Sequence, residues 1–330
     1  MRIGLALPQY DYSIAGEQPL RWETLLSTAR RAASAGFESL WLSDHLFLDI
    51  SKYGGPSEPA GAFEPLVTLA ALARAVEQPR LGVLVVCEAL RPASVLAKAL
   101  ATLDRVSGGR LEVGLGAGWY EPEYDAIGME MPPPGVRVAR LAEAVQIVAA
   151  LLASDGAPVS FDGTYHRAAG ARVLPPAQQH PRPPVLVGGK GDRVIRTAVQ
   201  YADGWNTCWV WTQEQYRERL DVVEAECERA GRDPASFRRT LGLYALCGED
   251  RGDLERRFDR LRANTPPGVL DGVTLDDWRA GRLVGTVPEV REQVAAWEGL
   301  GVEEIVVGAG AVPFHLGSAD DLDALAEALL

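Results

Sequence analysis

A histidine beside an aspartate, directly after a short apolar run, is the feature of this sequence best suited to proton transfer. The run over 39–43 ends in Ser43 and is followed by Asp44 and His45. An imidazole changes its charge near neutral pH, and a neighbouring carboxylate can set its tautomer. The pattern predicts a catalytic acid or base at His45 assisted by Asp44, while a purely structural hydrogen bond is the alternative.

A glycine-rich turn further along the chain has the composition of an anion site. It follows an apolar run, opens a helix and reads Gly188, Gly189, Lys190, Gly191, Asp192, Arg193. Glycines free the backbone N–H groups, a helix N-terminus adds partial positive charge, and Lys190 or Arg193 adds a full charge. The turn lacks the Gly-Lys-Ser/Thr ending of a Walker loop. It predicts a phosphate site, the alternative being a turn that only positions the helix.

Small residues also follow the fourth apolar run, at Gly116 and Gly118 before Trp119. Glycines there either let a flat ligand approach the backbone or simply form turns. Three tryptophans, at 205, 209 and 211, either line a pocket or cover the same end of the fold. The remaining histidines lack metal-ligand spacing, and the four cysteines form no CxxC pair, so we expect neither a metal site nor a disulfide framework.

Strand-length apolar runs alternate with helix-period segments and would place these residues at one rim. The runs cover 3–7, 39–43, 81–86, 111–115, 185–187, 204–207, 240–247 and 304–307. The helical segments cover 22–35, 63–75, 93–106, 137–152, 192–201, 213–230 and 320–329, with a partly irregular helical region at 253–296. Eight buried strands, each followed by a helix, predict an α/β fold of the (β/α)8 TIM-barrel type, with its site at the strands' carboxyl ends.

The alternative fold is an open doubly wound sheet, but no Gly-x-Gly-x-x-Gly turn follows the first strand. We expect one domain over residues 1–330, with an insertion at about 155–184 after strand 4. Loops of that length usually cover a site.

Charge and hydropathy limit the cellular locations and the kinds of binding partner to be expected for this protein. The formal net charge of −12 disfavours nucleic acid and anionic membranes as partners, because both are bound by clustered Lys and Arg. No apolar stretch reaches transmembrane length. Together with the dispersed cysteines, these features predict a cytoplasmic protein with a small-molecule substrate.

Taken together, the motifs resemble the luciferase-like monooxygenase superfamily, and more closely its actinobacterial branch of F420-dependent oxidoreductases. The resemblance spans nearly the whole chain. The segments that carry it are GFESLWLSDH at 36–45, AK at 97–98, ATLD at 101–104, SGGR at 107–110, GAGWYEPEY at 116–124, FDG at 161–163, PP at 183–184, GG at 188–189, YADGWN at 201–206 and GTVPE at 285–289.

The resemblance implies a deazaflavin or FMN across the barrel mouth, with its phosphate near Gly188–Arg193. Its ring would lie against the third strand, at Val83, Leu84 and Val86, where relatives often have a non-prolyl cis peptide, here expected near 83–84. In similar enzymes a histidine matching His45 acts beside the deazaflavin, with Asp44 accompanying it. A glutamate of the sugar-phosphate dehydrogenase relatives is replaced by Trp119, which argues against that activity.

The prediction is therefore an F420-dependent oxidoreductase that transfers a hydride between the deazaflavin and a small organic substrate. The alternative is an FMN-dependent monooxygenase that receives reduced flavin from a separate reductase and activates oxygen. A non-catalytic flavin-binding barrel is a third hypothesis. We expect a homodimer, which is common among the relatives and the commonest soluble assembly.

Overall fold

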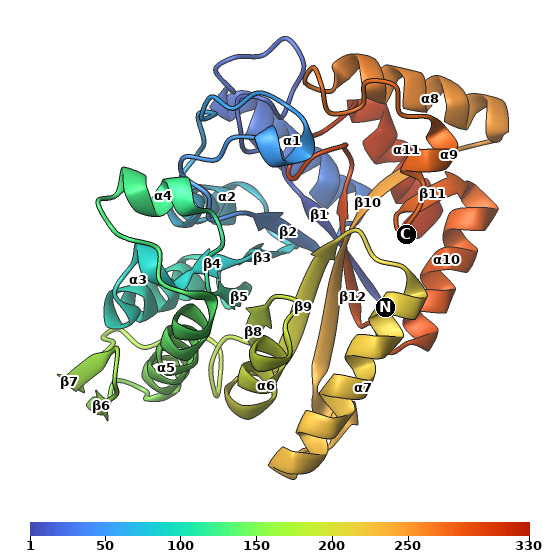
Figure 1. Cartoon of the computed structure of the whole chain (residues 1–330). Coiled ribbons are helices and arrows are strands. Elements are labelled where there is room, and N and C mark those ends of the chain that lie inside the picture. The colour runs from blue at the N-terminus through green and yellow to red at the C-terminus, as the bar shows by residue number, and fades with distance from the viewer.

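A computed structural model describes residues 1–330, and its centre is a closed barrel of eight parallel strands (Figure 1). Going round the barrel, the order is β10, β12, β1, β2, β3, β5, β8 and β9, and β9 pairs back onto β10. The predicted (β/α)8 barrel is confirmed. The strands of the barrel are β1 (Arg2–Ala6), β2 (Ser39–Leu42), β3 (Arg80–Val83), β5 (Leu111–Gly116), β8 (Val185–Gly188), β9 (Gly204–Trp209), β10 (Arg238–Gly248) and β12 (Glu304–Gly308).

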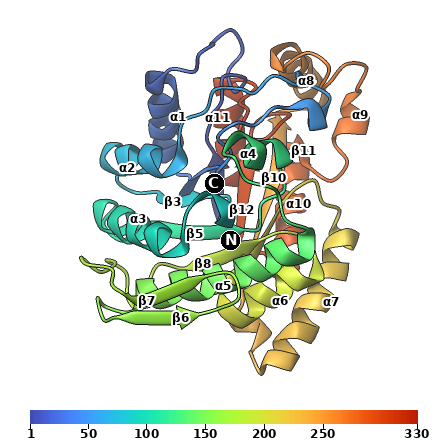
Figure 2. The ribbon, with the colours of Figure 1, turned by 60° about the vertical axis from the view of Figure 1, so that its left-hand side comes forward.

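The helices surround the barrel and cover the outer face of its strands (Figures 1 and 2). They are α1 (Trp22–Ala35), α2 (Pro65–Ala75), α3 (Ala93–Val106), α4 (Glu121–Ala126), α5 (Pro134–Ala153), α6 (Asp192–Tyr201), α7 (Gln213–Ala230), α8 (Arg251–Asn264), α9 (Leu275–Trp278), α10 (Val287–Gly299) and α11 (Ala319–Leu329). Three 3-10 turns are η1 (Ser51–Tyr53), η2 (Glu88–Leu90) and η3 (Pro234–Ser236).

Local signals explain the accuracy of several predicted boundaries. The helix α1 stops at Gly36, whose φ of 102° is readily adopted by glycine and whose N–H donates to the last turn. The helix α7 begins with a capping box between Thr212 and Gln215. Burial on both faces explains the unbroken apolar runs of the strands, whose side chains pack with those of the helices in a core of 63 buried residues.

Two strands depart from the sequence prediction. The run expected over 81–86 is divided into β3 and a two-residue strand β4 (Val86–Cys87), separated at Leu84–Val85 by a non-prolyl cis peptide. The region 253–296, expected to be helical and irregular, contains the strand β11 (Leu283–Thr286). This strand pairs only with the end of β10, which is long enough to extend past the barrel pairing. A four-residue strand between two helices leaves little periodicity to detect.

The segment 155–184 forms an antiparallel hairpin, β6 (Val159–Asp162) and β7 (Arg167–Ala171), outside the barrel beside α5 (Figure 2). The long helix α5 returns the chain to the amino end of the barrel before this segment begins. The segment is then anchored by Asp104, a buried residue of α3 whose carboxylate accepts the backbone N–H groups of Gln178 and Gln179 at 2.7 and 2.8 Å. No helix combines the length and apolarity needed to cross a bilayer.

We predict that Asp104→Ala destabilises the protein by about 2 kcal/mol, because it removes a buried carboxylate that accepts three hydrogen bonds from the segment. The third donor is the side-chain amide of Gln179, 2.7 Å from the carboxylate. Urea denaturation measures the loss, and limited proteolysis should show new cleavage within 172–184. The matched control is Asp221→Ala, at an exposed helical position of α7. Equal stability of the two variants would contradict the anchoring role.

Candidate active site

A cavity of about 480 Å³ opens at the carboxyl ends of the barrel strands. Its walls come from segments that are far apart in the sequence: 43–45 after β2, 84–85 after β3, 116–120 after β5, 188–190 after β8, and 206–209 of β9. The His45 segment and the glycine turn at 188–189 thus share one cavity. This is the rim at which barrels of this type place their sites.

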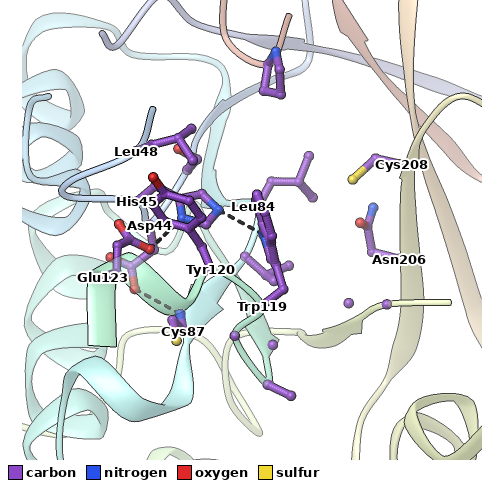
Figure 3. A pocket seen from close by; sticks show the side chains of 18 of the residues that line it. Asp44, His45, Leu48, Leu84, Cys87, Trp119, Tyr120, Glu123, Asn206 and Cys208 are labelled. Carbon is purple, nitrogen blue, oxygen red and sulfur yellow. Dashed lines mark hydrogen bonds and ion pairs between the residues drawn. The ribbon is translucent and has the colours of Figure 1, made fainter. Parts of the chain in front are cut away.

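His45 is held by a carboxylate that the sequence analysis did not assign. Its Nδ1 lies 2.7 Å from Oε2 of Glu123, whose side chain is 5% exposed. Its Nε2 lies 3.1 Å from the indole Nε1 of Trp119 (Figure 3). An indole N–H can only donate, so Nε2 is the acceptor, and Nδ1 carries the proton and donates a hydrogen bond to Glu123. The imidazole is therefore oriented and neutral, with Nε2 at the cavity.

The same glutamate joins two loops. Its second oxygen, Oε1, accepts the backbone N–H groups of Leu46 and Phe47 at 2.5 and 3.1 Å. The neighbouring Tyr120 donates its hydroxyl to Asp49 at 2.5 Å, which adds a second tie between the loops after β2 and β5. Glu123 lies in the first turn of the short helix α4. Although the GAGWYEPEY motif contains it, only the fold brings position 123 to position 45.

Asp44 does not contact the imidazole. Its carboxylate receives two bonds from Arg91, at 2.7 and 2.9 Å, and the backbone N–H of Cys87 at 2.9 Å. Burial raises the pKa of Asp44, and the Arg91 guanidinium opposes that shift. Asp44 therefore connects the end of β2 to the segment after β4, and the expected tautomer-setting role belongs to Glu123 instead.

The glycines at 116 and 188 are neighbours across the sheet, and both line the cavity. A Cβ at Gly116 would lie 2.5 Å from the side chain of Val85, and one at Gly188 would lie 2.8 Å from it. The absent side chains thus make room for Val85, which follows the cis peptide Leu84–Val85, one residue beyond the expected position. These glycines therefore have two roles. They leave room for the side chain of Val85 in the cavity wall, and they expose their own backbone to the cavity.

The turn at 188–193 contributes less to the cavity than its sequence suggested. The N–H of Gly189 donates to the carbonyl of Asn206 at 3.0 Å and is already used. Lys190 reaches the cavity, and its ammonium lies 4.6 Å from the ring centre of Trp211. Burial lowers the pKa of Lys190. Gly191 and Arg193 are not among the residues that line the cavity.

Of the other residues predicted to bind the cofactor, some line the cavity and some do not. Leu84, Gly118 and Trp119 line the cavity, whereas Val83 and Val86 have their side chains in the core. No residue of the 155–184 insertion lines it, which differs from the expectation for so long a segment.

The thiol of Cys87 also faces the cavity, and burial raises its pKa to about 11. At neutral pH it is therefore protonated and a poor nucleophile.

Three cations in the cavity wall have no carboxylate partner. They are Lys52, Arg137 and Lys190, none of which forms a salt bridge, while Asp44 is paired with Arg91 and Glu123 accepts hydrogen bonds from His45 and two backbone N–H groups. The Nε of Arg137 is buried without any hydrogen-bond partner. Lys52 lies 3.8 Å from the ring centre of Trp119. In a chain of net charge −12, this arrangement is suited to an anionic ligand.

Comparison with known proteins places this fold and site in a family. The model of the luciferase-like monooxygenases matches residues 1–304, so the chain belongs to the luciferase-like monooxygenase family. A phthiodiolone/phenolphthiodiolone dimycocerosates ketoreductase of Mycobacterium kansasii is 28% identical over 84% of this chain and 88% of its own. An F420-dependent hydroxymycolic acid dehydrogenase of Mycobacterium tuberculosis is 28% identical over 94% and 84%.

A solved structure supports the same assignment. The crystal structure of a monooxygenase from Streptomyces bottropensis superposes with a TM-score of 0.77, at 26% identity, and covers 100% of this chain and 98% of that one. The relatives thus include both oxidoreductases and monooxygenases.

The geometry predicts that His45 carries its proton on Nδ1, and that Glu123→Gln replaces this single tautomer with a mixture, because an amide can present either N or O. The chain has only four histidines, so long-range ¹H–¹⁵N NMR can resolve them. Glu121→Gln, an exposed change two residues away, is the control and should leave the His45 signals in place. A wild-type His45 protonated on Nε2 would contradict the assignment.

Proposed function

We propose that this protein is an F420-dependent oxidoreductase that transfers a hydride between the deazaflavin and a small organic substrate. The observation that carries the proposal is the imidazole of His45, which is fixed by Glu123 through Nδ1 and presents Nε2 to the cavity. A positioned acid–base group at the mouth of a barrel is what alcohol–carbonyl interconversion requires of a protein.

The residues present fit a phosphate-bearing, polyanionic cofactor. The unpaired ammonium of Lys190 and the buried, unsatisfied Nε of Arg137 are available to its anionic groups. The wall formed by Leu84, Val85 and the glycines at 116 and 188 is apolar and is suited to a flat ring. When bound, the deazaflavin supplies the centre that exchanges a hydride with the substrate carbon.

The chain's own contribution is proton transfer and orientation. Oxidation of an alcohol removes a hydride from the carbinol carbon and a proton from the hydroxyl, and leaves a carbonyl. His45 takes that proton on Nε2, while Glu123 stabilises the resulting imidazolium through Nδ1–H. In the reverse direction the protonated His45 returns the proton to the oxygen. A hydroxyl bound at Nε2 replaces the Trp119 N–H, which then becomes a donor for the same oxygen.

The alternative is an FMN-dependent monooxygenase supplied by a separate reductase. It is supported by the Streptomyces bottropensis structure, which is that of a monooxygenase. The F420-dependent dehydrogenase relative, and the ketoreductase relative that acts on a carbonyl, favour the deazaflavin. A proton-transfer pair in the cavity wall also suits carbonyl chemistry directly.

We predict that F420 binds the apo protein and that His45→Ala lowers kcat for F420-dependent turnover roughly a hundredfold or more without weakening F420 binding, because the imidazole moves a proton and does not hold the cofactor. Fluorescence titration with F420 and FMN, followed by steady-state assays, measures both. Glu121→Gln is the surface control. Tight FMN binding with no response to F420 would contradict the proposed deazaflavin cofactor. Unchanged rates in His45→Ala would contradict the proposed catalytic role of His45.

We further predict that Lys190→Ala raises the Kd for F420 about tenfold and leaves kcat at saturation unchanged, because one charge-assisted contact to an anion is lost. Arg193→Ala is the matched control, since this cation of the same turn does not line the cavity. Equal weakening by the two substitutions would show that the anion is bound outside the cavity, at the helix N-terminus.

A further inference from the structure

Five aromatic rings form a continuous line of contacts along one side of the cavity. Tyr12 stacks on Tyr10 with ring centres 4.8 Å apart, and Tyr10 meets Phe314 edge-on at 6.4 Å. Phe314 meets Trp209 edge-on at 5.6 Å, and Trp209 stacks on Tyr244 at 5.3 Å. We call this line the aromatic wall. It is assembled from the loops after β1 and β12 and from β9 and β10, and the sequence analysis did not identify it.

Three members of the aromatic wall, Tyr10, Trp209 and Phe314, line the cavity, while Tyr12 and Tyr244 lie behind them. The support is rigid: Tyr244 is 3% exposed, and the hydroxyl of Tyr12 donates to the carbonyl of Pro313 at 3.1 Å. A Cβ at Gly308 would lie 3.2 Å from the ring of Tyr244 and 3.4 Å from that of Trp209, so glycine leaves just enough space for this pair.

Phe314 adopts a backbone conformation that is rare for its residue type. Its φ is 58°, in the left-handed region that a bulky residue enters only at a cost. The ring is 2% exposed and lines the cavity. Such outliers persist where the surroundings enforce them and are concentrated at functional sites. Here the outlier holds an aromatic face against the space where a ligand would lie.

Charge is distributed unevenly around the cavity. The cations Lys52, Arg137 and Lys190 and the carboxylates Asp44 and Glu123 all belong to other segments of its lining. The aromatic wall contains no charged side chain, and Leu48 and Leu84 belong to the same apolar cluster. An anionic group placed against this wall would lose its hydration without gaining a positively charged partner.

We propose that the aromatic wall is the subsite for the body of the substrate, and that the substrate is an uncharged molecule with a flat aromatic or fused-ring body that carries the reacting carbinol or carbonyl. Ring faces and edges at fixed angles recognise another ring better than a flexible aliphatic chain. The inference rests on the proposed function only for the identity of the reacting group. The affinity for the ring body depends on the wall alone.

The first experiment is independent of turnover. Calorimetric titration of the ligand-free protein with 1-tetralone, cyclohexanone and 4-acetylbenzoate should show 1-tetralone binding about tenfold more tightly than cyclohexanone. Any binding of the carboxylate belongs to the unpaired cations and should be the same in Trp209→Leu. Trp209→Leu should abolish the preference for the aromatic ketone, and Phe314→Leu should reduce it. Trp22→Leu, which removes an indole of α1 that packs on Phe63 outside the cavity, should leave the preference intact. Circular dichroism confirms that each variant is folded.

Equal affinity for the two neutral ketones, an unchanged preference in folded Trp209→Leu, or weaker binding of the carboxylate in folded Trp209→Leu would each overturn the inference. The second experiment compares kcat/KM for the two neutral ketones with reduced F420. Selective binding without F420 turnover would refute the proposed function and leave the aromatic subsite standing. Turnover of cyclohexanone at a rate equal to that of 1-tetralone would refute the subsite and leave the proposed function standing.

Discussion

The hydrogen bonds of one buried carboxylate organise this site. Glu123 accepts hydrogen bonds from Nδ1–H of His45 and from two backbone N–H groups of the same loop, so the carboxyl ends of β2 and β5 are held in a single geometry. A buried carboxylate without these donors would be costly, which makes the arrangement self-consistent: the glutamate requires the loop, and the loop presents the imidazole. The orientation of Nε2 toward the cavity follows from it.

The cavity around the His45–Glu123 pair has two parts that differ in charge and polarity. Unpaired cations from the segments after β2 and β8 and from α5 make one part suited to an anionic group, whereas the aromatic wall makes another part suited to an uncharged ring. Val85 fits into the space left by the glycines at 116 and 188, and it forms part of the cavity wall. A barrel permits this division because each strand contributes an independent loop to one rim.

Family membership and the side chains of the site bear on different properties of this protein. Membership of the luciferase-like monooxygenase family establishes the class of fold and an oxidoreductase or monooxygenase activity among the relatives. The choice between carbonyl chemistry and oxygen chemistry depends on the side chains at the rim. A neutral imidazole hydrogen-bonded to a carboxylate, as in His45 and Glu123, is suited to accepting and returning one proton.

The sequence by itself determined the barrel, since eight apolar runs separated by helical periods carry their own local signals, including Gly36 and the Thr212 capping box. It also singled out His45 and Lys190, because strand ends converge at one rim. Only the tertiary structure decided that Glu123, not the adjacent Asp44, orients the imidazole, and that Tyr10, Trp209, Tyr244 and Phe314 form one wall. These contacts join residues 35 to 304 positions apart and depend on strand register and loop path, which no local pattern encodes.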